Sequence, residues 1–293
     1  IFGDFEGATV PNADLRLPEE SLWSDEFNGL EVWNGFDIGD SNLDGRRENR
    51  SLDRVMRDWI SMLSLGKFAT PAGNSDTHKA VADPVGMPRT LVRVPDDSGD
   101  ALATEAAVDA VLATQTGVAN TPRDIVVTNG PMIEVTSANQ PAIGRVVTAS
   151  GSVTLTVKIT SPDWAEFDTL EVFANSTPGP VLDGVSVLQP LTCFTSRTIN
   201  TLDANAPCAL ASLDSATMNV QLANVPGPGN HKRFEATVTV TLDPTDIATR
   251  TGATGTDAWI VFRVNGNRAI FPLLTNDTID DEDSLAALLG GDF

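Results

Sequence analysis

The sequence has very few of the side chains on which several classes of enzyme depend. It contains two histidines, His78 and His231, and two cysteines, Cys193 and Cys208. These small numbers exclude a zinc ribbon, a CxxC redox centre and an HExxH zinc site. The GxSxG elbow, the Walker loop and the GxGxxG fingerprint are absent as well. The serine hydrolase, P-loop NTPase and Rossmann interpretations are therefore dropped.

Basic residues and long apolar runs are also scarce. The 293 residues include 40 Asp and Glu against 19 Lys and Arg, which gives a formal net charge of −21. This acidity argues against nucleic acids and anionic membrane surfaces as partners, because both are bound through clustered Lys and Arg. No apolar stretch approaches the roughly 20 residues that cross a bilayer, so no membrane span is predicted. The hydrophobic fraction of 41% is ordinary and predicts a sizeable core.

Strand-like and helix-like patterns alternate in the first part of the chain, which we assign to an α/β domain over 1–135. Apolar spacing predicts an amphipathic helix over 52–63, and an Ala-rich segment predicts a second helix over 104–113. Short apolar runs predict strands at 29–33, 67–70 and 90–94. Strands that alternate with helices predict βα units around a parallel sheet.

The pattern changes to all-β after about residue 135. Apolar and polar residues alternate with period two at 153–159, 170–173, 236–242 and 258–264. This alternation is typical of an immunoglobulin-like antiparallel β-sandwich, here over 136–275, with an acidic tail at 276–293. Cys193 and Cys208 lie in a loop-rich stretch of this region. They would form a disulfide in an exported protein, and two unpaired buried thiols are the alternative.

The segment GNSDTH at 73–78 contains candidate metal ligands directly after a predicted strand. Loops at the carboxyl ends of parallel strands form the active-site face of β/α folds. Asp76 and His78 are two residues apart, so in extended backbone both side chains project the same way. A carboxylate with an imidazole suits Zn, Mn or Fe rather than calcium. The alternative is a loop histidine that hydrogen-bonds to a neighbouring aspartate.

Five segments, in matching order, resemble PHP-domain metallohydrolases of the CehA/McbA type. They are LEVWNG at 30–35, GNSDTH at 73–78, GMPRT at 86–90, NGP at 129–131 and SPDW at 161–164. The resemblance implies part of a distorted parallel β/α barrel that holds two or three divalent metal ions. It also implies that metal-activated water hydrolyses a small phosphoester, ester or carbamate substrate.

The resemblance assigns roles to individual residues. Asp76 and His78 match the family's last metal-binding motif and are the expected catalytic residues. Glu31 and Asn34 match a position near the site, and Asn34 is a candidate contact for substrate. Arg89 is a candidate for binding a substrate phosphate or carboxylate through its planar guanidinium, with a structural salt bridge as the alternative.

The family draws most of its ligands from an N-terminal half with an H-x-H motif and further histidines, which this chain lacks. Two ligands do not hold a catalytic zinc, which normally has three protein ligands and a water. We therefore expect the C-terminal portion of a barrel, cut from a longer protein, followed by the sandwich. Its open strand edge would pair with the N-terminal half of the barrel or with a second copy of the chain.

A calcium site is a separate hypothesis. Asp40, Asn42 and Asp44 match D-x-N-x-D-G, the first half of an EF-hand-type loop, although Ser51 stands where the bidentate Glu is expected. The alternative is a surface turn that caps the following helix. Calcium here would suit a different function, a non-catalytic extracellular module for binding or structure. The acidity and the expected disulfide favour a secreted or periplasmic protein.

Overall fold

The structure is a computed structural model that describes residues 27, 29–35, 50–64, 66–77, 85–94, 98–102, 124–148, 150–175, 178–182, 185–188, 190–196, 208, 216–227, 229, 231–252 and 257–266. The first elements are β1 (Gly29–Asn34), α2 (Arg50–Ser64), β2 (Thr70–Asn74), β3 (Arg89–Val92), α3 (Gly99–Leu102) and β4 (Ile125–Thr128). The strands that follow are β5 (Met132–Ser137), β6 (Gln140–Pro141), β7 (Val153–Pro162), β8 (Thr169–Ala174), β9 (Pro178–Leu182), β10 (Val185–Leu188), β11 (Thr192–Thr195), β12 (Ala216–Thr217), β13 (Gln221–Asn224) and β14 (Lys232–Leu242). The last elements are α5 (Pro244–Thr251) and β15 (Ile260–Asn265).

Strands β1 and β2 pair in parallel, with α2 as the connection between them. This is the βαβ unit that the alternating pattern predicts, and α2 closely matches the expected helix. The second strand, however, begins later than the expected 67–70. The amide of Lys67 donates to the carbonyl oxygen of Met62 at 2.9 Å, and the amide of Gly66 donates to that of Leu63 at 3.0 Å. These two bonds close the end of α2, so residue 67 still belongs to the helix terminus.

Strands β3 and β4 do not continue a parallel sheet. They pair antiparallel, from Arg89 opposite Thr128 to Val92 opposite Ile125. The guanidinium of Arg93 forms an ion pair with Asp124 at 2.5 Å, just beyond the last paired residues. The expectation of parallel pairing therefore holds for β1 and β2 and is wrong for β3 and β4. No closed barrel forms among the described strands, and the expected helix over 104–113 lies outside the described residues.

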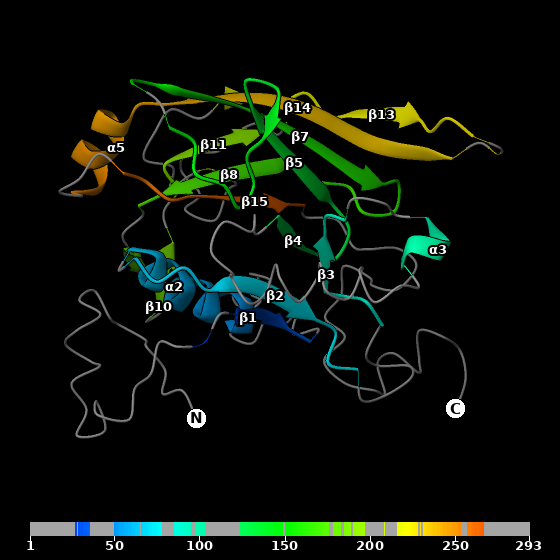
Figure 1. The fold of residues 1–293 in the computed structure, drawn as a ribbon, viewed down its shortest axis with the longest axis horizontal. Helices are drawn as coiled ribbons and strands as arrows, with labels where there is room; N and C mark the ends of the chain where they lie inside the picture. The colour runs from blue at the N-terminus through cyan, green and yellow to red at the C-terminus, as the bar shows by residue number, and fades with distance from the viewer. Residues whose placement is uncertain are drawn as a thin grey trace.

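Two sheets form a β-sandwich in the second half of the chain (Figure 1). One has the strand order β13-β14-β7-β5-β6 and the other β12-β11-β8-β15, with every pair antiparallel except β11 and β12. Alternate side chains of β7 and β14 are buried, as their period-two pattern predicts. The apolar core is formed by Val135, Leu155, Val157, Ile159, Phe167, Leu170, Val172, Ala174, Leu191, Met218, Ala236, Val238, Val240, Leu242 and Ile247. The described part of the chain is thus mainly β.

The sandwich begins slightly earlier than the expected residue 136, because β5 pairs with β7 from Met132 onwards. Cys193 in β11 forms the expected disulfide with Cys208. The acidic tail over 276–293 lies outside the described residues. Within the described residues, no helix has the length and apolar character needed to cross a membrane.

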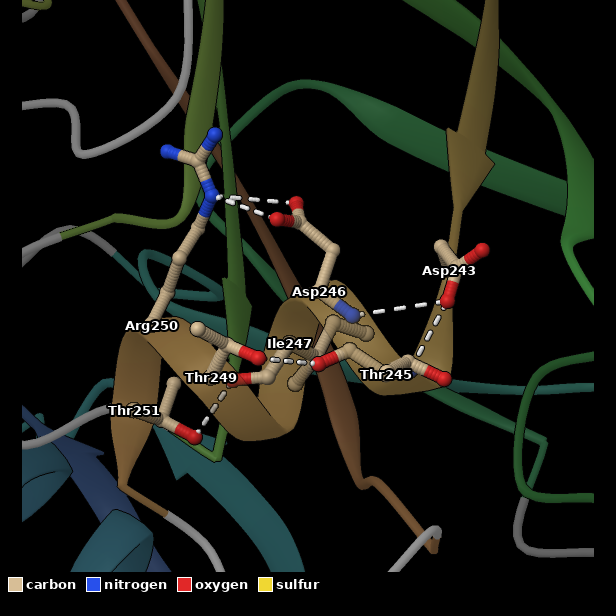
Figure 2. Close-up of polar contacts among 7 residues, drawn as sticks. All are labelled: Asp243, Thr245, Asp246, Ile247, Thr249, Arg250 and Thr251. Atoms are coloured by element: carbon tan, nitrogen blue, oxygen red, sulfur yellow. Dashed lines mark hydrogen bonds and ion pairs between the residues drawn. The ribbon is translucent and has the colours of Figure 1, made fainter.

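Helix α5 follows β14 directly, and hydrogen bonds at its first turn stabilise it (Figure 2). The carboxylate of Asp243 accepts hydrogen bonds from the amides of Thr245 at 2.8 Å and Asp246 at 3.4 Å. These two backbone donors, Thr245 first, hold the pKa of Asp243 below its ordinary value of 3.8. Arg250 pairs with Asp246 one turn earlier at 3.0 Å. Ile247 is buried in the sandwich core and anchors the helix there.

Helix α2 packs on the outer face of the sheet that contains β8 and β15. Met56 and Ile60 of α2 contact Phe173, whose side chain is on the opposite face of β8 from the sandwich core. Trp259 joins this cluster, and its indole N–H donates to the hydroxyl of Ser64 at 3.2 Å. Strand β8 is therefore buried on both faces, by the sandwich core and by α2. Figure 1 shows α2, β1 and β2 together on this side of the sandwich.

Candidate functional site

The carboxyl ends of β1 and β2 lie side by side, as a parallel pair requires. Asn34 stands opposite Asn74 in the register, and the amide of Gly35 donates to the carbonyl oxygen of Asn74 at 2.9 Å. Asp76 follows two residues beyond the end of β2, and its side chain is exposed to solvent. A Cβ built on Gly35 would lie 3.9 Å from the Cβ of Asp76. The LEVWNG and GNSDTH segments therefore meet at one edge of this sheet.

The backbone around Asp76 is fixed by local hydrogen bonds. The amide of Asp76 donates to Oδ1 of Asn74 at 2.7 Å, which forms an Asx turn. Asp76 itself has a φ of 45°, in the left-handed region that aspartate tolerates better than most side chains. The hydroxyl of Thr77 donates to Oγ of Ser75 at 2.9 Å. Together these bonds fix the backbone of the turn that contains Asp76.

A threonine hydroxyl joins β2 to β3. Oγ1 of Thr90 accepts a hydrogen bond from the amide of Gly73 at 2.9 Å and donates to the carbonyl oxygen of Gly73 at 2.8 Å. Gly73 leaves no room for a side chain, since a Cβ there would lie 2.4 Å from Cγ1 of Val127 in β4. The GNSDTH and GMPRT segments therefore contact each other directly at Gly73 and Thr90.

The remaining predicted site residues have the following surroundings. The side-chain amide of Asn34 donates to the carboxylate of Glu31 at 2.8 Å, so both are on the β1 side of this edge. The guanidinium of Arg89 donates to the carbonyl oxygen of Gly86 at 3.1 Å. His78 lies outside the described residues, and so does the expected calcium loop with Asp40, Asn42 and Asp44.

The metal ions that the resemblance implies are not held by the described residues alone. Within that portion, no three His, Cys, Asp or Glu side chains come close enough to bind one ion. The described edge supplies the carboxylates of Asp76 and Glu31, which is short of the three protein ligands of a catalytic zinc. A complete metal centre here needs ligands from outside the described residues.

The indole of Trp33 is a further polar feature of β1. Its Nε1 is buried and has no hydrogen-bond acceptor among the described residues. Leaving such a donor unpaired costs about 1–3 kcal/mol. Sequence analysis did not identify Trp33 or Thr90 as site residues. Both lie within the segments that resemble the metallohydrolases, and no other feature of the sequence distinguishes them.

The NGP and SPDW segments also meet in space. A Cβ on Gly130 would lie 2.6 Å from the Cβ of Ala165 and 3.7 Å from the ring of Trp164. The hydroxyl of Thr128 accepts from the amide of Gly130 at 2.9 Å and donates to the carbonyl oxygen of Pro131 at 2.5 Å. The turn between β4 and β5 is therefore packed tightly against the turn between β7 and β8.

Comparison of the chain with family models, curated proteins and solved structures finds no match in any of the three. These comparisons assign no family to the chain.

Proposed function

We propose that this chain is the C-terminal portion of a metal-dependent hydrolase that resembles the PHP-domain enzymes of the CehA/McbA type. In this proposal Asp76 and His78 bind a divalent transition metal, Zn, Mn or Fe, at the carboxyl end of β2. The substrate is a small phosphoester, ester or carbamate. The observation that carries the proposal is the position of Asp76, just beyond the carboxyl end of a parallel strand and beside the end of its neighbour.

That position is where β/α folds assemble their active sites, because the loops after parallel strands converge there. Asp76 is exposed to solvent, and Asn34 on the adjacent strand end lies on the same edge. A bound metal would supply Lewis acidity and lower the pKa of water. Arg89 would bind the anionic group of the substrate, and Asn34 would orient it.

The arrangement of the resembling segments supports the family interpretation. Gly73 contacts Thr90, and Gly130 lies against Trp164, so two pairs of these segments are neighbours in the fold. In this proposal the order β5-β7-β14-β13 is the A-B-E-D sheet of an immunoglobulin-like sandwich, and the order β11-β8-β15 supplies its C′, C and F strands. The parallel β1–α2–β2 unit supplies part of the proposed barrel.

In this proposal a partner supplies the metal ligands that the described residues lack. We propose that an N-terminal half of the barrel, or a second copy of the chain, completes the site by pairing with an open strand edge. The disulfide between Cys193 and Cys208 and the net charge of −21 support a secreted or periplasmic location.

Elemental analysis of the purified, undialysed chain, together with hydrolysis of 4-nitrophenyl esters and phosphodiesters, tests the proposal. With the completing partner present, as a co-purified N-terminal half or a second copy of the chain, we expect zinc, manganese or iron in the wild type and loss of metal and activity in Asp76→Asn and His78→Ala. Asp257→Asn makes the same chemical change as Asp76→Asn at an exposed residue of the sandwich region, and it should retain both properties. Equal metal content in Asp76→Asn and Asp257→Asn would contradict the role of Asp76.

A non-catalytic extracellular binding or structural module is the second candidate. The observation that favours it is that the described residues contain no group of three metal-ligating side chains. In this interpretation calcium at Asp40, Asn42 and Asp44 would stabilise a loop, and the β1–α2–β2 unit would be inert. Calcium as the only bound metal, with no hydrolysis in any variant, would support the module and contradict the hydrolase.

A further inference from the structure

We propose that strand β13 is an interaction surface for a second copy of this chain, which pairs with it antiparallel about a two-fold axis. Strand β13 is at the edge of the five-stranded sheet, with β14 on one side and no described strand on the other (Figure 1). An unpaired strand edge is a template for a strand of another chain. This surface belongs to the sandwich, so the inference does not rest on the proposed hydrolase.

Strand β13 is the most accessible edge among the described strands of the sandwich. The edge positions belong to β6, β12, β13 and β15. Strands β6 and β12 are only two residues long, and β6 ends at Pro141. The side chains of β15 are partly covered from Ile260 to Val264. In β13, by contrast, Leu222 is 49% exposed. Lysine, proline and bulges usually protect such edges, and β13 has none of them.

The surroundings of β13 lack the acidity of the chain as a whole. No charged residue occurs over 215–230, whereas the whole chain has a formal net charge of −21. The four residues of β14 opposite β13 include Lys232, Arg233 and Glu235, which sum to 2 − 1 = +1. Arg233 and Glu235 also form an ion pair with each other. A second copy can therefore approach this edge without the like-charge repulsion that an acidic surface would impose.

The backbone of β13 directs hydrogen-bonding groups toward the free edge. The amide of Val225 donates to the carbonyl oxygen of His231 at 2.9 Å, in register with the pairing of β13 and β14. Along an antiparallel strand, successive residues direct their amides and carbonyls to alternate sides. Ala223 therefore directs these groups toward β14, as Val225 does. Leu222 and Asn224 direct theirs away from β14, where a second strand can bind them.

These directions select a register for the pair of β13 strands. A two-fold axis at Ala223 places Leu222 of one copy opposite Asn224 of the other, which pairs all the outward amides and carbonyls of both residues. It also keeps the core-facing sides of the two sheets on one side, because residues directly opposite each other share a face. The two copies of Leu222 become diagonal neighbours, within reach of long side chains. Since the contact is two-fold symmetric, it closes at a dimer.

Sedimentation velocity of the full chain at physiological ionic strength, up to a concentration of about 1 mM, tests the proposal. The variants are Leu222→Lys, Asn224→Pro and Val146→Lys. Val146→Lys is the matched control, because Val146 is a 94% exposed apolar residue outside the sheets and the change in charge is the same. Asn224→Pro removes an outward amide but no donor of the β13–β14 ladder. Thermal unfolding of each variant is recorded separately.

We expect the wild type and Val146→Lys to dimerise equally. Leu222→Lys and Asn224→Pro should each weaken the dimer by at least about tenfold, because each leaves groups of the paired edge without a partner. If Asn224→Pro does not fold, the comparison of Leu222→Lys with Val146→Lys decides alone. A monomeric wild type at every concentration would overturn the proposal. So would equal dimerisation of Leu222→Lys and Val146→Lys, and assemblies larger than a dimer would contradict the two-fold closure.

Discussion

Truncation of Phe173 to alanine should detach α2 from the sandwich before the sandwich itself unfolds. The ring of Phe173 is fully buried between β8 and α2, where it contacts Met56 and Ile60. The guanidinium of Arg263 also lies 5.2 Å from the ring centroid. Removing a buried phenylalanine side chain typically costs about 3–5 kcal/mol. Because Phe173 is outside the core between the two sheets, most of this loss should fall on the α2 interface.

Hydrogen exchange by mass spectrometry with Phe167→Ala as the matched control measures this effect. Phe167 is also fully buried, but in the core between the sheets, so its loss weakens the surface on which α2 rests. In Phe173→Ala we expect faster exchange in α2 while β7 and β14 stay protected. In Phe167→Ala we expect α2, β7 and β14 to lose protection together. Unchanged protection of α2 in Phe173→Ala would refute the idea that this cluster docks the helix.

Two further predictions concern sites with specific geometry. Gly130→Ala should destabilise the protein by about 1–3 kcal/mol, since its Cβ would overlap that of Ala165, which has no rotamer to move away. Chemical denaturation should show Gly151→Ala, where nothing lies within 4 Å, to be close to neutral. Asp243 has a lowered pKa, so its stabilisation is present above the ordinary value of 3.8 and is lost as pH falls through the folded value. Thermal unfolding from neutral to strongly acidic pH should show a smaller pH dependence for Asp243→Asn than for wild type, and identical pH profiles would contradict this role of Asp243.

Elements whose residues repeat with a clear period were predictable from the sequence. The alternation in β7 and β14 requires one buried face, and the structure buries that face. The spacing over 52–63 gave a helix that the structure extends only to Arg50–Ser64. The position of Asp76 at the end of a parallel strand was also predictable, because a strand before GNSDTH and a helix before that strand define a βαβ unit.

Elements that depend on contacts between distant residues were not predictable. The start of β2 depends on the hydrogen bonds that end α2 at Gly66 and Lys67, which an apolar run at 67–70 does not reveal. The direction of β4 relative to β3 depends on how the chain returns to Asp124, and strand propensity contains no information on direction. The contact of Thr90 with Gly73 joins a side chain to backbone across 17 residues, so no periodic signal marks it.

Close contacts at Gly73 and Gly130 connect the candidate site to the sandwich through β4. Gly73 packs on Val127 of β4, and three residues later Gly130 packs on Ala165 of the sandwich. Strand β2 is thus fixed to β4, and β4 is fixed to the turn that leads into β5. The docking of α2 on Phe173 restrains the same unit from its other side. The sandwich is therefore packed against the β1–α2–β2 unit at both places, and this packing restrains the strand that precedes Asp76.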